Sequence, residues 1–122
     1  MKELFYYLRD KNNHPICTVA LMEADDGTIS RGVAIRSEKE KEFSRKAGRR
    51  LASGRAKKAM YTKSNNYPTI SREAIIRVID TGEIDDKHYS FFIKSHFNPS
   101  LTSFEKELLA RRGTDGTNKT EA

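Results

Sequence analysis

The stretch KAGRRLASGRAKKA, residues 46–59, decides how this chain can fold, because it combines six cationic side chains with seven small ones and a single leucine. Alanine, arginine and lysine are strong helix formers, so the stretch predicts a helix. Such a helix has almost no large apolar side chain with which to bind an ordinary core. The pattern indicates a thin helix that lets another part of the protein come close while cations stay beside the contact.

The small residues of this helix fall on two neighbouring arcs when the helix is advanced by about 100° per residue. The first arc consists of Phe43, Ala47, Leu51 and Gly54, and the second consists of Gly48, Ala52, Ala56 and Ala59. Lys46, Arg50 and Lys57 cluster on the remaining side. We expect that cationic side to face the solvent.

The two glycines in this helix, Gly48 and Gly54, indicate a packing or binding requirement. Each costs about 0.8–1 kcal/mol of stability relative to alanine in a helix interior. One interpretation is close helix–helix packing, within the chain or across a dimer. A second, compatible interpretation adds that Arg45, Arg49 and Arg55, beside the small residues, line a pocket for a phosphate-bearing ligand. Arginine suits that role because its planar fork can bind a phosphate through two hydrogen bonds and can also stack on a base.

Three strand-like segments precede the helix, at residues 3–9, 16–23 and 29–37. They are rich in apolar, aromatic and β-branched residues. Two turn clusters, DKNNHP and ADDGT, separate them. Short strands joined by Asn-, Asp- and Gly-rich turns predict an antiparallel meander.

The third of these segments, ISRGVAIRS, has two unlike faces, because successive side chains of a strand alternate. One face carries Ile29, Arg31, Val33 and Ile35, and the other carries Ser30, Gly32, Ala34 and Arg36. The Ser–Gly–Ala face is too flat for an ordinary core surface. It predicts that a backbone, a helix or a ligand approaches closely there.

Capping signals divide the rest of the chain into elements. A capping box, Ser37 to Glu40, with glutamates at 38, 40 and 42, predicts that the long helix begins near residue 37 and runs to about 62. A second helix is expected at 71–80, a fourth strand at 88–97, and a third helix after the capping box Thr102 to Glu105. Residues 113–122 are polar and are expected to be a disordered tail.

These elements predict an α+β fold in a single domain spanning residues 1–112. A small antiparallel sheet, made of the N-terminal meander and the later strand, would pack with one long and two shorter helices. The hydrophobic content of 36% indicates a modest core, so oligomerisation is expected. Cys17 lies in an apolar run and is interpreted as a small buried hydrophobe. No leader peptide and no segment long enough to span a membrane is predicted.

The net charge of +6 favours a polyanionic partner such as a nucleotide, a nucleic acid or an acidic surface. The aromatic segment SFFIKSHFNP offers rings on which a purine could stack, and alternation places Phe92 with the polar Lys94 and His96. Asn98 could read a base edge. No metal-binding spacing, nucleophile elbow or P-loop is found, so no catalytic residue, cofactor or metal is predicted. The candidate ligand-binding residues are Arg31, Arg45, Arg49, Arg55, Phe92, His96 and Asn98.

The succession of a meander, ISRGVAIRS and a capped helix bearing AGRRLASGRAKKA resembles the first-described type of phage anti-Thoeris sponge, over roughly residues 3–112. The resemblance implies a non-enzymatic protein that sequesters cyclic ADP-ribose signals and blocks Thoeris immunity in the host bacterial cytoplasm. It implies homodimers that assemble into hexamers and hold intact ligands in pockets between protomers. Some members of that group also hold cyclic trinucleotides at a separate site. Arg49, Arg55, Phe92 and Asn98 are the residues here that fit a ligand with a pyrophosphate, a purine and two riboses.

Three other functions remain open at the level of the sequence. The main alternative is a small basic phage protein that binds nucleic acid, although no helix-turn-helix, RNA-recognition or zinc signature is present. A phage inhibitor that meets an acidic protein partner through its cations would have no affinity for nucleotides. An enzyme of nucleotide turnover is the last alternative, because no nucleophile or base is evident.

Overall fold

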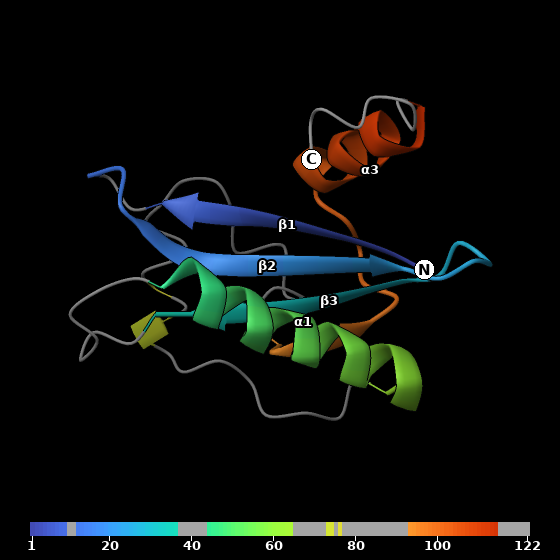
Figure 1. Cartoon of the computed structure of the whole chain (residues 1–122), viewed down its shortest axis with the longest axis horizontal. Helices are drawn as coiled ribbons and strands as arrows, with labels where there is room; N and C mark the ends of the chain where they lie inside the picture. Colours follow the sequence, from blue (N-terminus) through green and yellow to red (C-terminus); the bar gives the residue numbers. More distant parts are fainter. Residues whose placement is uncertain (10–11, 37–43, 65–72, 75, 77–92, 115–122) are drawn as a thin grey trace.

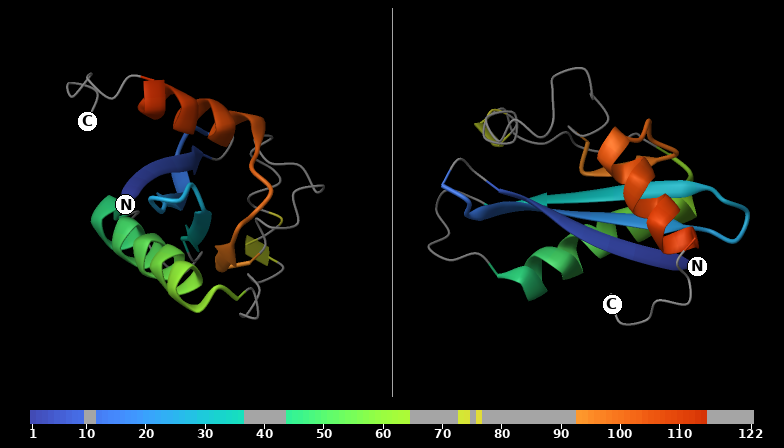
Figure 2. Two further views of the ribbon diagram at one scale, coloured as in Figure 1. Left: turned by 90° about the vertical axis from the view of Figure 1, so that its right-hand side faces the viewer. Right: turned by 90° about the horizontal axis from the view of Figure 1, so that it is seen from above.

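The computed structural model describes residues 1–9, 12–36, 44–64, 73–74, 76 and 93–114. They form one four-stranded antiparallel sheet in the order β1-β2-β3-β4. The strands are β1 (Lys2–Arg9), β2 (Pro15–Glu23), β3 (Ile29–Ile35) and β4 (Ser95–Phe97). Helix α1 (Arg45–Thr62) packs on one face of the sheet and α3 (Ser103–Thr114) packs on the other (Figure 1 and Figure 2).

The predicted meander is confirmed, with strand boundaries within two residues of those expected. Both turn clusters contain a residue with a left-handed backbone, as their Asn- and Gly-containing sequences indicate. Asn13 and Gly27 adopt positive φ angles of 67° and 90°, which asparagine and glycine tolerate better than other residues. The β2–β3 turn is closed by a hydrogen bond from the backbone N–H of Ala24 to the carbonyl of Thr28, at 2.8 Å.

Strand β2 forms the centre of the fold, and every residue from Ile16 to Met22 is buried. One cluster of buried residues lies on the α3 side of the sheet and includes Tyr6, Leu8, Ile16, Cys17, Val19, Leu21 and Val33. The second lies on the α1 side and includes Ala20, Met22, Ala34, Ala52, Ala56 and Met60. The sheet is therefore a middle layer with a separate apolar core on each face, and the prediction that Cys17 is buried is confirmed.

The flat face of β3 is confirmed as a site of close approach, and the approaching element is α1. A Cβ atom added to Gly32 would lie 1.9 Å from the carbonyl oxygen of Ala52 and 2.5 Å from the backbone nitrogen of Ala56. Next to this contact, the hydroxyl of Ser30 donates to the carbonyl of Ala56 at 2.8 Å. The thin side of the helix is thus occupied by β3 of the same chain, so it is not the face that meets a second subunit's helix.

The start of α1 differs from the prediction. Ser44 has an extended backbone, with φ −109° and ψ 112°, and its hydroxyl accepts from the backbone N–H of Ala47 at 3.1 Å. This is N-cap geometry, so the helix begins at Arg45 and does not run through from residue 37. The predicted capping box from Ser37 to Glu40 lies outside the described residues.

The predicted capping box of the last helix is confirmed. The backbone N–H of Thr102 donates to the Glu105 carboxylate at 2.9 Å, and the Glu105 N–H donates to the Thr102 hydroxyl at 3.1 Å. The helix continues to Thr114, two residues beyond the expected domain end. The remaining predicted tail lies outside the described residues.

Two later elements are described only in part. Within the predicted second helix, residues 71–80, Glu73, Ala74 and Ile76 are helical and the others lie outside the described residues. Strand β4 covers only Ser95–Phe97 of the predicted strand 88–97, and residues 88–92 are likewise outside. An α+β architecture with a four-stranded sheet is established, together with one long and one shorter helix.

Candidate functional site

Helix α1 lies over β3 and β2, and one row of its side chains reaches across to β1 at the edge of the sheet. The guanidinium of Arg45 lies over the ring of Tyr7, with its carbon 5.3 Å from the ring centre. One helical turn later, the guanidinium of Arg49 lies over the ring of Phe5 at 5.9 Å. A further turn on, the hydroxyl of Ser53 donates to the carboxylate of Glu3 at 2.6 Å. We call Arg45, Arg49, Phe5 and Tyr7 the arginine–aromatic row.

The row is regular because two backbone repeats coincide. Residues four apart on a helix are separated by about 6 Å along its axis. Residues two apart on a strand share a face and are separated by about 6.6–6.8 Å. Arg45 and Arg49 therefore meet Tyr7 and Phe5 in register, and each cation–π contact adds about 0.5–1 kcal/mol at such exposed positions. The two guanidiniums are held one helical turn apart.

The electrostatics of the row favour an anion. Arg45 and Lys46 occupy the first turn of α1, which contains no acidic residue. Cations at this end oppose the helix dipole, whose N-terminal end is positive. Arg45 and Arg49 are exposed, and neither donates a hydrogen bond to any residue in the described ranges. Among the described residues, no acceptor competes with an external anion for their N–H groups.

Arg31 does not lie in such a site, contrary to its inclusion among the ligand-binding candidates. Its side chain is fully buried on the α3 side of the sheet. The guanidinium forms an ion pair with Glu105, through Nη2 to Oε1 and through Nε to Oε2 at 2.9 Å. Its Nη2 also donates to the carbonyl of Ser100 at 3.1 Å. We therefore assign Arg31 to the core, where it anchors α3.

Arg55 is half-buried and is partly engaged within the chain. Its Nη1 donates to the carbonyl of Val33 at 2.6 Å. Burial lowers the pKa of the Arg55 guanidinium from its usual value. Arg55 therefore braces α1 against β3, on the side of the helix away from β1.

The candidates on β4 lie at the opposite edge of the sheet from the arginine–aromatic row. His96 is half-buried and pairs in register with Arg31, so it belongs to the α3 side. Asn98 is exposed, has a φ of 54°, and its backbone N–H donates to the carbonyl of Ile29 at 2.8 Å. Asn98 thus ends β4 in a conformation that asparagine tolerates. Phe92 lies outside the described residues.

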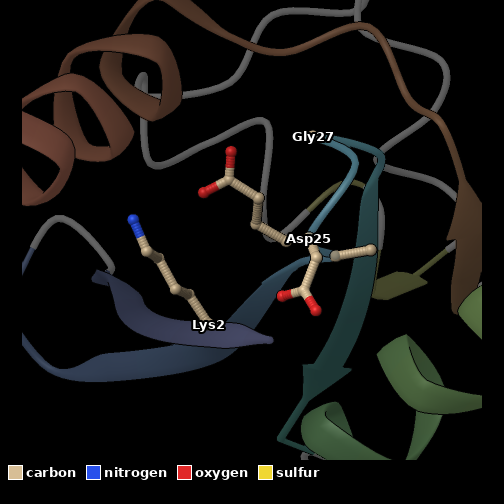
Figure 3. A pocket seen from close by; sticks show the side chains of 5 residues that line it. Lys2, Asp25 and Gly27 are labelled. Carbon is tan, nitrogen blue, oxygen red and sulfur yellow. The ribbon is translucent and has the colours of Figure 1, made fainter.

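A cavity of about 230 Å³ lies at the end of the sheet where β1 begins (Figure 3). Its lining residues are Lys2, Glu23, Ala24, Asp25 and Gly27. The Asp25 carboxylate in this lining forms an ion pair with the N-terminal amino group, with 3.2 Å between the nitrogen and the Oδ1 oxygen. The two carboxylates in this lining would repel a pyrophosphate, and none of the predicted ligand-binding residues lies there. The cavity is therefore not a candidate for the predicted ligand.

The aromatic half of the arginine–aromatic row was missed by sequence reasoning. Phe5 and Tyr7 were interpreted only as strand residues. The signal that could have found them is the match between residues 3, 5 and 7, on one strand face, and residues 45, 49 and 53, on one helix face. That match becomes informative only when the packing of the helix on the sheet, with this row directed toward β1, is known.

The described part of the chain contains no group of three or more His, Cys, Asp or Glu side chains placed to hold a metal ion. None of the helices in the described ranges is long and apolar enough to cross a membrane.

In comparisons with known proteins, no protein-family model matches the chain, and no curated protein or solved structure is significantly similar to it.

Proposed function

We propose that this protein binds and sequesters a compact phosphate-bearing nucleotide of the cyclic ADP-ribose class without cleaving it. In that role a phage would use it in the host bacterial cytoplasm to block Thoeris signalling. The observation that carries the proposal is the arginine–aromatic row, in which the exposed guanidiniums of Arg45 and Arg49 lie over Tyr7 and Phe5. The resemblance of the segment order to the anti-Thoeris sponges supplies the identity of the ligand.

The chemistry of the row suits a pyrophosphate. Two guanidiniums one helical turn apart can each donate to a different phosphate oxygen, and charge-assisted hydrogen bonds of this kind are worth about 1.5–3 kcal/mol each. The aromatic rings beneath them reduce the side-chain freedom that binding would otherwise remove. The positive end of α1 adds to the attraction.

The same residues favour binding over catalysis. An arginine stays protonated at neutral pH, so it orients and stabilises an anion without acting as a general base. Phenylalanine offers neither a nucleophile nor an ionisable proton, and the row contains no histidine or carboxylate to act as a general base. The proposal therefore requires that the ligand leaves the protein chemically unchanged.

The row is open to solvent, whereas a tightly held nucleotide is mostly enclosed. We therefore include in the proposal that a second copy of the chain supplies the opposite wall, in a homodimer or a hexamer. Native mass spectrometry and light scattering measure the mass directly. A protein that stays monomeric both with and without ligand would rule out a pocket shared between two copies of the chain.

Isothermal titration calorimetry tests the ligand class. The panel contains cyclic ADP-ribose isomers, linear ADP-ribose, a cyclic trinucleotide and adenosine, which lacks phosphate. We expect tight binding of at least one cyclic ADP-ribose isomer, no binding of adenosine, and release of intact ligand on heating, as judged by chromatography. Binding of none of the phosphate-bearing compounds would reject the proposal.

A double variant, Arg45→Gln/Arg49→Gln, tests the site. We expect its affinity for the bound isomer to fall by about 3–6 kcal/mol, the value of two charge-assisted hydrogen bonds. The matched control is Lys106→Gln/Arg111→Gln, which removes two exposed cations from α3 on the other side of the sheet. Equal losses in both variants would indicate attraction by net charge and not a site on β1.

A further inference from the structure

We propose that the outer face of α1 is a second interaction surface, which binds the backbone and bases of single-stranded nucleic acid. This surface consists of Lys46, Arg50, Gly54, Lys57 and Tyr61, and we call it the outer stripe. It is separate from the arginine–aromatic row and does not depend on the function proposed for that row.

The outer stripe follows one line along the helix. Its members fall within an arc of about 80° when each residue advances by about 100°. The buried residues of the helix, Ala52, Ala56, Ala59 and Met60, contact the sheet from the opposite side. The helix forms the outermost layer on its side of the molecule (Figure 1 and Figure 2). The stripe is therefore a solvent-facing surface about 22 Å long, from the rise of fifteen residues.

The charge of the stripe is uncompensated within the described chain. Helix α1 carries seven arginines and lysines and no acidic residue. Lys46, Arg50 and Lys57 are exposed, and none of them forms an ion pair or a hydrogen bond with a residue in the described ranges. Three cations in a line complement a row of phosphates, which is why we choose a polyanion as the occupant.

Two further members of the stripe favour nucleic acid over an acidic protein. Tyr61 is 74% exposed at the end of the stripe, so its ring has a free face for a base. Gly54 lies between Arg50 and Tyr61, and an added Cβ there would meet no atom within 4 Å. No contact inside the described chain requires a glycine at this position. Its missing side chain leaves a flat place where a sugar–phosphate backbone can approach the helix.

Fluorescence anisotropy with a labelled oligomer of twenty deoxythymidines tests the proposal on the full-length protein. Three cation–phosphate contacts predict a slope of about −2 in a plot of log affinity against log salt, because each contact on a single strand contributes about −0.7. The variant Arg50→Gln/Lys57→Gln should reduce that slope to about −0.7. The control Lys106→Gln/Arg111→Gln removes the same charge from α3 and should leave the slope unchanged.

A second pair of variants tests the aromatic contribution. Tyr61→Ala should weaken binding of the oligomer by about ten-fold, while Tyr61→Phe, which keeps the ring, should bind like the natural protein. Circular dichroism of each variant confirms that the helix is intact. Since Tyr61 and Lys57 are exposed, their replacement should not disturb the fold.

Four outcomes would overturn the proposal. The first is no binding of the oligomer at low salt, and the second is an equal loss of slope in the α3 control. The third is identical affinity of Tyr61→Ala and Tyr61→Phe. The fourth is binding of polyglutamate that depends on Arg50 and Lys57 as strongly as oligomer binding does, which would identify an acidic protein as the partner instead.

Discussion

Arg31 and Glu105 lie 74 positions apart in the sequence and form an ion pair in which both side chains are fully buried. The hydroxyl of Tyr6 donates to the same carboxylate at 2.6 Å, and the backbone N–H of Thr102 donates to it at 2.9 Å. The carboxylate thus joins β1, β3 and the start of α3. The network thus holds the start of α3 on the sheet, next to the apolar contacts that Leu108 and Leu109 make with the core.

Removal of either partner of this ion pair should strongly destabilise the fold. Arg31→Met or Glu105→Gln should lower the free energy of unfolding by about 3–5 kcal/mol, because each leaves a buried charge without its counter-charge. The double variant Arg31→Met/Glu105→Gln should recover part of that loss, because it removes both charges and keeps an acceptor for Tyr6 and Thr102. Urea denaturation measures the effect. The control is Glu107→Gln, at an exposed position on the same helix, which should change the free energy of unfolding by less than about 0.5 kcal/mol. If the single variants at Arg31 and Glu105 are as stable as this control, the ion pair does not have the proposed role.

Gly32 and Gly54 lie in opposite environments, because a Cβ atom at Gly32 would overlap α1 whereas a Cβ atom at Gly54 would meet no atom within 4 Å. Gly32→Ala should destabilise the protein by at least 1–3 kcal/mol, since its Cβ would overlap the backbone of Ala52 and force α1 away from β3. Gly54→Ala should stabilise it by about 0.8–1 kcal/mol, because its Cβ would meet nothing and alanine is the better helix former. Thermal unfolding of both variants checks the opposite signs. A destabilised Gly54→Ala protein would show that another chain packs against that position.

The fold was predictable where neighbouring residues carry the information. The turns around Asn13 and Gly27, the alternation of β3 and the capping box of Thr102 and Glu105 all depend on residues close in sequence. The close approach of a thin helix to the Ser30–Ala34 face followed from the small side chains on both surfaces. The start of α1 was predicted incorrectly, because the Ser37–Glu40 pattern was interpreted as its N-cap, whereas Ser44 caps the helix.

The candidate site was less predictable because it depends on contacts between distant residues. Nothing near Arg31 in the sequence shows that its partner is Glu105, so a core arginine was mistaken for a ligand-binding one. Arg45 and Arg49 were identified from the helix, but their aromatic partners on β1 were not. The separation of His96 and Asn98 from this row follows from the strand order, which places β1 and β4 at opposite edges.

High pH should weaken the fold through Tyr6. Burial, and secondarily the Glu105 charge, raises the pKa of the Tyr6 hydroxyl well above its usual value of 10.0. A group with a raised folded-state pKa stabilises the fold fully below its unfolded pKa, and that contribution is lost as pH rises from about 10 through the folded value. We expect the midpoint of urea unfolding to fall above pH 10. Tyr6→Phe should be less stable at neutral pH but lose less stability between pH 9 and 11; equal alkaline losses in both proteins would exclude Tyr6 as the cause.

Substitution of Ser44, the N-cap of α1, should change the stability of the fold and the affinity for ligand in opposite directions. Ser44→Asp keeps an acceptor for the Ala47 N–H and places a negative charge at the positive end of the helix, beside Arg45 and Lys46. It should stabilise the protein by about 0.3–1 kcal/mol. The same charge should weaken the binding of a pyrophosphate ligand to the arginine–aromatic row, because it repels the phosphates and attracts the guanidiniums away from them. Ser44→Asn, a neutral cap of similar strength, should change neither quantity by much. Thermal unfolding and calorimetry on the three proteins measure both effects, and a Ser44→Asp protein that binds cyclic ADP-ribose as tightly as the natural one would place the ligand away from this end of the helix.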